Sequence, residues 1–289
     1  MSEATAKTED RHLEWTLAAL DLERLDENTF SAAPEGGSHR LFGGMVGAQS
    51  VMAGGRTVAA DRKLHSLHAY FLRPGASGLP LRFDILRTRE GGSYSTRRIT
   101  ASQEGTPIFD AVASFAADEE GLSHQTIDMP TAPDPGGLPH RERERARRYK
   151  EKLGVEVAPY ESAVEVRLCD PTVVDPGSRE PRQDNWLRVS GSFEDDPLLQ
   201  RALLVYASDR TLVSTARMPF EEPRNRLISV SLDHAIWFHH DVDIRDWHLC
   251  QTTSPAGSHG RGLVLCHIYR SDGLCVATVA QEALVRVRR

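Results

Sequence analysis

Residues 42–58 read FGGMVGAQSVMAGGRTV, a helix-like segment that four strand-like segments follow. The four are LHSLHAYFLRP (64–74), LRFDILRT (81–88), YSTRRITASQ (94–103) and PIFDAVASFA (107–116). Because the strands come after the helix and short turns join them, this order predicts an antiparallel sheet around one central helix. Alternating β-α-β units would require a helix between successive strands.

The second half of the chain repeats this order of elements. A helix-like segment, LLQRALLVYASDRTLVSTAR (198–217), precedes LISVSLDHAIWFHH (227–240), WHLCQTTS (247–254), GLVLCHIYR (262–270) and LCVATVAQEALVRV (274–287). His68 aligns with His234, and the turn Glu104-Gly105 aligns with Asp272-Gly273. One internal repeat of this size predicts two copies of one α+β unit, which can join edge to edge.

The middle of the chain is irregular. MPTAPDPGGLPH (129–140) is rich in Pro and Gly, and RERERARRYKEK (141–152) is almost wholly charged. The first stretch predicts a linker, and the second a solvated helix or an exposed tether. Residues 170–185 are predicted to form a long loop, and the boundary between the two copies is expected within residues 121–160.

Composition excludes several classes of protein. The 289 residues suggest two domains, and a net charge of −6 argues against nucleic-acid binding. The cysteines have no C-x-x-C spacing, which disfavours a disulfide scaffold or zinc ribbon: Cys169, Cys250, Cys266 and Cys275. The segment MSEATAKTEDRHLEW lacks the pattern of a signal peptide, and no apolar run approaches the roughly 18 residues of a membrane helix. We therefore expect a cytoplasmic protein that does not enter a membrane.

Asp209 is an anomaly in the second helix-like segment. Positions three and four residues away are apolar, so the carboxylate falls on an apolar helix face. Desolvation raises the pKa of such a carboxyl group, and perturbed carboxylates concentrate at functional sites. The alternative is a structural Asp that pairs with Arg210 or Arg217 or caps a local kink.

Two polar positions in the later strands are further candidates. Gln281 is the one amide on an otherwise apolar alternating face of the last strand, and a buried amide needs hydrogen-bond partners. A Gln that only satisfies a backbone group is the alternative. In residues 228–238 the even positions are apolar except His234, and the odd positions include Ser229 and Ser231. The alternation leaves open which face meets the helix and which serine is functional.

The internal repeat provides a comparison between the two copies. Gln281 aligns with Ala113, Ser231 aligns with His65, and residues 42–58 contain no carboxylate. The three polar candidates thus occur together in the second copy and are absent together from the first. A requirement of the fold would appear in both copies, so the pattern favours function.

Several motifs resemble those of the TesB-type acyl-CoA thioesterase II family, and they run in that family's order over nearly the whole chain. They are FGGMVGAQ, HSLHAYFLRPG, GGSYSTRR, TPIFDAVASF, ASD (207–209), VSLDHAIWFHH and ATVAQEALVR. The resemblance implies an α+β double hot-dog fold, with two antiparallel sheets that each wrap around a central helix and join into one continuous sheet. It implies a non-catalytic hot-dog at 1–120, a linker with a charged helix at 121–160, and a catalytic hot-dog at 161–289.

The resemblance also implies a function. In this family an Asp, a Thr and a Gln hold the water that attacks an acyl-CoA thioester, and they fall on Asp209, Ser231 and Gln281. Fatty acid and CoA are the expected products. General-base activation of water and direct attack by Asp209 through an anhydride both stay open. No cofactor or metal is expected. The protein is expected to form a homodimer or a homotetramer.

Backbone N–H groups near Gly43 and Gly44 are the expected oxyanion donors. Arg73, Arg97 and Arg98 are candidates for contact with CoA phosphates, with ordinary solvated arginines as the alternative.

Three other readings remain. The first is a hot-dog protein that binds acyl-CoA or a lipid without hydrolysing it. The second is a hydratase that uses His234 and Asp233, although neighbours on a strand point to opposite faces. The third is a metal site at His234, His239 and His240, where the last two also point oppositely.

Overall fold

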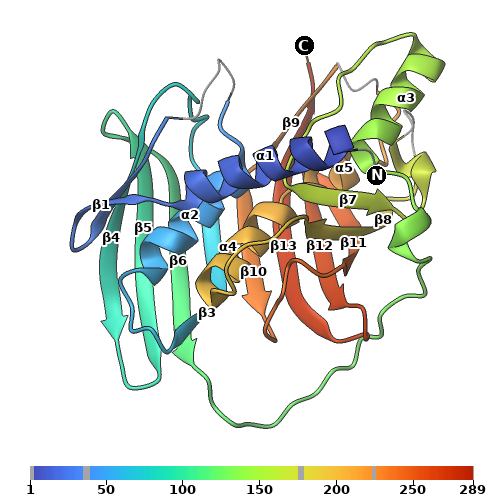
Figure 1. Ribbon diagram of the computed structural model, residues 1–289. Coiled ribbons are helices and arrows are strands. Elements are labelled where there is room, and N and C mark those ends of the chain that lie inside the picture. Colours follow the sequence, from blue (N-terminus) through green and yellow to red (C-terminus); the bar gives the residue numbers. More distant parts are fainter. Residues whose placement is uncertain (1–2, 35–39, 175–178, 223–225, 289) are drawn as a thin grey trace.

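The chain forms one 13-stranded antiparallel sheet that curves around two central helices (Figure 1). The computed structural model describes residues 3–34, 40–174, 179–222 and 226–288. The strands of the first half are β1 (Glu23–Asp26), β2 (Thr29–Ala32), β3 (Arg62–Phe71), β4 (Leu81–Glu90), β5 (Tyr94–Gln103) and β6 (Thr106–Ala117). Those of the second half are β7 (Val164–Leu168), β8 (Arg182–Val189), β9 (Leu227–Ser231), β10 (Asp233–Phe238), β11 (His248–Ser258), β12 (Arg261–Arg270) and β13 (Cys275–Val287).

The strand order of the second half mirrors that of the first. The sheet runs β1-β2-β4-β5-β6-β3-β10-β13-β12-β11-β8-β7, and β9 pairs with β13 beside β10. β3 and β10 pair in the middle, with Ala69 opposite His234. The two repeats therefore join edge to edge into one continuous sheet, as the sequence predicts, and one hydrophobic core contains side chains from both halves.

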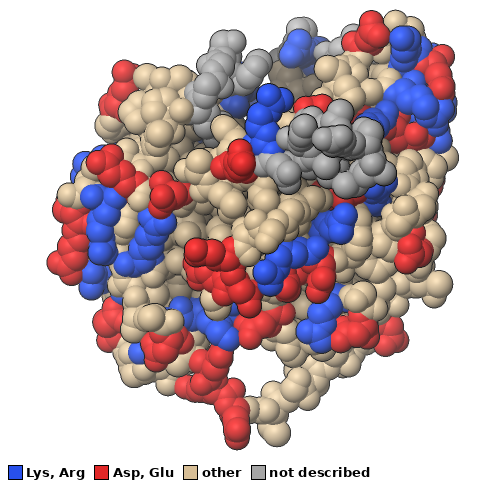
Figure 2. Space-filling view, in the orientation of Figure 1, with Lys and Arg blue, Asp and Glu red and all other residues tan. Residues whose placement is uncertain are grey.

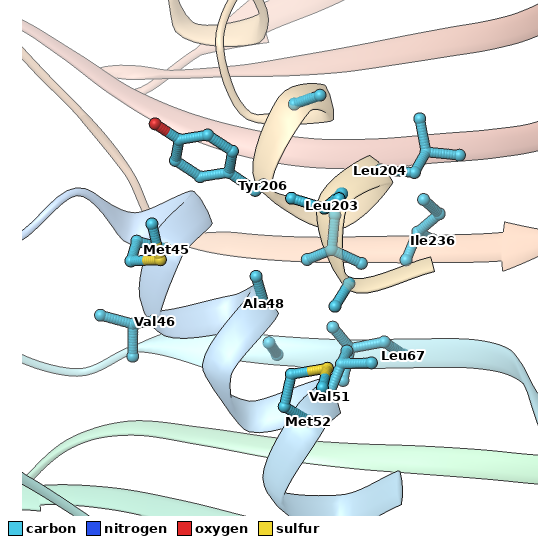
Figure 3. Packing of buried hydrophobic residues seen from close by; sticks show 14 of the residues in the cluster. Met45, Val46, Ala48, Val51, Met52, Leu67, Leu203, Leu204, Tyr206 and Ile236 are labelled. Carbon is cyan, nitrogen blue, oxygen red and sulfur yellow. The ribbon is translucent and has the colours of Figure 1, made fainter. Parts of the chain in front are cut away.

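The central helices are α2 (Gly43–Gly55) and α4 (Pro197–Ser208), and they pack antiparallel against each other (Figure 3). Gly44 lies against the end of α4, where an added Cβ would come within 2.8 Å of the Tyr206 carbonyl oxygen. Gly55 lies against the start of α4, where a Cβ would come within 2.3 Å of Leu198. The small residues of α2 thus bring its N-terminus to the C-terminus of α4.

Two predicted elements are broken in the structure. Residues 198–217 form α4 and a separate short helix, α5 (Leu212–Arg217), with Asp209 as the C-cap of α4. Residues 227–240 form β9 and β10, separated at Leu232. Several elements were not predicted: α1 (Glu3–Leu20), β1, β2, β7 and β8, the last of which begins inside the predicted loop 170–185, after the short helix η2 (Pro171–Val174).

The middle segment is tethered to the second half. Residues 118–134 have neither helix nor strand, and they run from β6 beneath the sheet (Figure 1). Gln125 accepts from the Cys275 N–H at 2.8 Å, and Trp186 donates to the Pro133 carbonyl at 2.8 Å. After η1 (Pro135–Gly137) comes α3 (Arg141–Leu153), the predicted charged helix.

The start of α3 is not solvated, contrary to the sequence-based expectation. α3 packs against β7 and η2, and the side chains of Arg141, Glu142 and Glu144 are buried. Arg141 pairs with Glu142 and donates to Ser214 Oγ on α5 at 3.2 Å. The charged segment is therefore part of the folded second half, because ion pairs satisfy its buried charges.

Candidate active site

Asp209 lies where the two central helices meet, at the C-terminus of α4 and beside the N-terminus of α2. Its side chain is buried, with 8% exposed. Phe42, the N-cap of α2, has no side chain that can accept a hydrogen bond from the first turn. The Asp209 carboxylate instead interacts with the backbone of Gly44 in that turn, which lowers its pKa, so it faces the start of a helix from the other half of the chain.

Glycine is required at the start of α2 for this approach. A Cβ on Gly43 would lie 3.2 Å from Asp209 Oδ2 and 2.6 Å from the Phe71 ring. The Gly44 backbone, expected from the sequence to supply an oxyanion donor, also faces this carboxylate and lowers its pKa. Gly43 and Gly44 both stay as predicted donors.

The three residues predicted from the sequence come together in one chain of hydrogen bonds. Gln281 Nε2 on β13 donates to Ser231 Oγ on β9 at 3.0 Å. Ser231 Oγ donates to Asp209 Oδ1 at 3.3 Å. Gln281 is fully buried, and Ser231 is partly buried. The chain joins an amide, a hydroxyl and a carboxylate from three separate elements.

Burial raises the pKa of Asp209 above its ordinary range. His234, Gln281, Ser231 and the Gly44 N–H each lower this pKa, but by less than burial raises it. A carboxylate with a raised pKa is a stronger base than an exposed one, which suits it to remove a proton from water near neutral pH.

A shift in strand register brings both Ser231 and His234 to the inner face of the sheet. β9 pairs with β13 so that Ser231 lies opposite Ala283, whereas β10 pairs so that Ala235 lies opposite Ala280, a shift of one residue. The odd positions of β9 are therefore partly buried, and the even positions of β10 are buried. This bulge decides which alternating positions of residues 227–240 face the helices, a point that the sequence left open.

Asp233 stabilises the bulge. Its Oδ1 accepts from the Glu282 N–H at 2.6 Å, while the Leu232 N–H donates to the Glu282 carbonyl at 2.9 Å. The carboxylate thus satisfies a backbone donor that the register shift leaves without a ladder partner.

His234 belongs to the site, although sequence reasoning assigned it only to the rival readings. The ring is buried, with Nδ1 2.7 Å from Gln281 Oε1 and Nε2 3.1 Å from Ser208 Oγ. Because Gln281 Nε2 donates to Ser231, its Oε1 must accept, so His234 Nδ1 carries the hydrogen. The signal in the sequence was the one ionisable group among the even, otherwise apolar positions of residues 228–238.

The first half carries apolar side chains at the matching positions. The β3–β6 pairing has the same one-residue shift, with Phe115 opposite Leu64 and Ala113 opposite Leu67. By this register Leu64, Leu67 and Ala113 correspond to Ser231, His234 and Gln281. The sequence alignment of His68 with His234 was therefore wrong by one residue, and so was that of His65 with Ser231: His68 is exposed, whereas His234 is buried.

The arginines considered for CoA phosphates lie elsewhere in the first half. Arg97 is fully buried and donates to Thr57 and Glu90, Arg98 pairs with Asp110 at 2.7 Å, and Arg73 donates to the Pro107 carbonyl. These contacts give Arg97 a structural role.

The structure also bears on two alternatives from the sequence: that Asp209 pairs with Arg210 or Arg217, and that three histidines bind a metal. Arg210 lies over the rings of Phe42 and Tyr160, and Arg217 donates to Ser229 Oγ at 3.2 Å. His239 contacts Thr278 Oγ1 at 2.9 Å and does not join His234. Across the part of the chain that the structure describes, no three His, Cys, Asp or Glu side chains gather as metal ligands would.

Comparisons with known proteins agree with this fold. A family model described as acyl-CoA thioesterase matches residues 157–284, and one described as acyl-CoA thioesterase N-terminal domain matches residues 32–116. Human acyl-coenzyme A thioesterase 8 is 34% identical over 286 residues, covering 93% of this chain and 88% of that protein.

Solved structures give the same result. An acyl-CoA thioesterase II from Mycobacterium marinum matches with a TM-score of 0.79 and 35% identity, covering 94% of this chain and 97% of that one. A hot dog fold protein from Alicyclobacillus acidocaldarius matches with a TM-score of 0.70 at 19% identity, covering 95% and 99% of the two chains. The fold is therefore a double hot-dog, as predicted. The chain belongs to the acyl-CoA thioesterase family, and within it to the thioesterase II, or TesB, type.

Proposed function

We propose that this protein hydrolyses acyl-CoA thioesters to a carboxylic acid and CoA, with a water molecule held by Asp209, Ser231 and Gln281. The observation that carries the proposal is the hydrogen-bond chain from Gln281 through Ser231 to a buried Asp209. The chain occurs in one half of a repeat whose other half has Leu64 and Ala113 at the positions that match Ser231 and Gln281. Family membership supports the same reaction.

The residue types suit a thioester. Asp209 accepts a proton from the water as its oxygen attacks the thioester carbon, and Ser231 and Gln281 orient that water. The tetrahedral intermediate then collapses, the carbon–sulfur bond breaks, and CoA leaves as a thiolate. A thiol is a good leaving group, with a pKa near 8.5 by analogy with Cys, so the site needs no strong general acid.

The experiment that tests this proposal uses purified protein and a panel of acyl-CoAs of increasing chain length. Free thiol is followed with a chromogenic disulfide. Release of CoA from at least one acyl-CoA is expected. Tight binding of acyl-CoA without thiol release would favour the non-hydrolytic binding protein instead.

A hydratase is the second enzymatic candidate, and the contacts in the site do not favour it. The Asp233 carboxylate is engaged by the Glu282 N–H, and the His234 ring contacts Gln281 and Ser208. A catalytic His–Asp dyad would need the two groups to face one substrate. Hydration of an enoyl-CoA, measured as the loss of its ultraviolet absorbance, would support this candidate.

The proposal also concerns where the protein is located and whether it forms oligomers. Among the described residues, no helix is long and apolar enough to cross a membrane. We propose a cytoplasmic location and a homo-oligomeric state, and both stay predictions.

A further inference from the structure

A pocket lies between α3, α5 and the start of β9, the strand that ends at Ser231 of the candidate active site. Four of its lining residues are arginines from three segments: Arg141, Arg145, Arg179 and Arg217. Tyr149 and Phe220 add aromatic side chains to the lining. The charged stretch that the sequence assigned to a linker thus forms one wall of a pocket.

The pocket and the active site share one face of β9. Leu227 lines the pocket, Ser229 receives a hydrogen bond from Arg217, and Ser231 belongs to the site. These alternate positions are the partly buried ones of the strand, and their neighbours are exposed. At about 3.3 Å per residue, Leu227 lies about 13 Å from Ser231. Arg217, which lines the pocket, donates to Ser229 between these two positions.

Positively charged side chains outnumber negatively charged ones among the described residues that line the pocket. Glu142 takes ion pairs from both Arg141 and Arg145, and Glu222 is the one acidic residue among the described lining residues. Burial raises the pKa of Glu142, but the charges of Arg141, Arg145 and Arg210 outweigh it and hold this pKa below its usual range. Over α3, Figure 2 shows Lys and Arg beside Asp and Glu. A guanidinium has five N–H donors, so a carboxylate partner and a phosphate can share one arginine.

We propose that this pocket binds the phosphorylated adenosine end of coenzyme A while the thioester lies at Asp209. The inference rests on the proposed function. Arginines bind phosphate oxygens through paired hydrogen bonds, and Tyr149 and Phe220 offer aromatic surface to the adenine ring. The pantetheine arm of CoA is long enough to bridge the interval along β9.

The test compares two substrates that share the acyl group and the thioester. One is acyl-CoA, and the other is the acyl thioester of N-acetylcysteamine, which lacks the nucleotide. Arg145→Gln and Arg179→Gln are each expected to lower the ratio of kcat/KM for acyl-CoA to kcat/KM for the truncated thioester by about tenfold. Arg143→Gln is the matched control, because Arg143 is exposed on the same helix and does not line the pocket.

Adenosine 3′,5′-bisphosphate gives a second measurement on the unaltered protein. It is expected to inhibit acyl-CoA hydrolysis competitively and to leave hydrolysis of the truncated thioester unchanged. Ratios that stay at the wild-type value in both arginine variants would overturn the inference. Non-competitive inhibition would also overturn it, because the pocket would then hold a free nucleotide during turnover. A wild-type protein that cleaves neither thioester would instead count against the proposed function.

Discussion

His234 is the residue whose role sequence patterns did not assign, and the geometry gives it a positioning role. Its Nδ1–H holds Gln281 Oε1 at 2.7 Å, which turns the amide nitrogen toward Ser231. Without that donor the Gln281 amide can flip and leave the Ser231 hydroxyl without its partner. His234 therefore acts on the reaction through Gln281.

We expect His234→Leu to lower kcat by about 10²-fold with little change in KM, because misplacing the water affects the chemical step more than binding. Leu is the residue that the first half has at the matching position. His234→Asn keeps an N–H donor near the Nδ1 position and is expected to restore part of the loss. His267→Leu is the control, since His267 is also partly buried and contacts a threonine outside the site. Equal losses in His234→Asn and His234→Leu would show that only packing is affected.

The raised pKa of Asp209 has a consequence for stability. A carboxyl group with a higher pKa in the folded state contributes stability below its unfolded pKa, and that contribution disappears as pH rises through the folded pKa. We therefore expect Asp209→Asn to raise Tm at neutral pH, with a difference from the wild type that shrinks as pH falls. Calorimetric melts over the acid-to-neutral range measure this. A lower Tm for Asp209→Asn at neutral pH would contradict it.

At the scale of elements, the break between β9 and β10 puts Ser231 and His234 on the same side of the sheet. The first half has the same register shift between β3 and β6 but no polar residues there. The bulge is thus a property of the fold, and the second half places its polar side chains on it. Alternation in residues 227–240 is compatible with one straight strand, so the sequence could not reveal the shift.

The role of the Asp233 carboxylate as a hydrogen-bond acceptor in the bulge is testable. Asp233→Ala removes the partner of the Glu282 N–H and is expected to cost about 1–3 kcal/mol in the free energy of unfolding. Turnover should also fall, because Ser231 and His234 lose their fixed register. Asp233→Asn keeps a carbonyl oxygen and is expected to retain most of both. Urea unfolding and thiol release measure the two effects, and unchanged stability in Asp233→Ala would refute this role.

The break at Asp209 shows why tertiary contacts escape sequence patterns. Residues 198–217 contain neither Gly nor Pro, so their periodicity predicts one helix. In the structure Asp209 accepts a hydrogen bond from Ser231 and faces the Gly44 backbone, and the helix ends there. The anomaly of a carboxylate on an apolar face was visible, whereas its partners on α2 and β9 were not.

At the scale of the whole molecule, the repeat made most of the architecture predictable. The order of one helix and four strands in each half was sufficient for the antiparallel sheet and the two central helices. The outermost two strands at each end of the sheet, β1, β2, β7 and β8, were missed. The charged residues of β8 (RQDNWLRV) and β1 (ERLD) are typical of loops. The contact between α2 and α4, which completes the site, depends on both halves and follows from neither alone.

The outer face of the sheet bears on the predicted oligomer. Tyr70, Val112 and Trp237 are exposed on the adjacent strands β3, β6 and β10, and His68 packs edge-on against Trp237 at 4.9 Å. Apolar side chains gathered on a sheet face are typical of an interface. We expect light scattering to give a dimer or tetramer, and Tyr70→Lys combined with Trp237→Lys to reduce its mass. A monomeric wild type at micromolar concentration would contradict this expectation.

Thiol release by Asp209→Asn tests the central claim most directly, because the substitution removes the base and keeps the shape of the side chain. Wild-type and variant proteins with matching circular dichroism spectra are given the same acyl-CoA. Release by the variant is expected to be slower by about 10²–10⁴-fold. Release at the wild-type rate would contradict the assignment of Asp209 as the catalytic base.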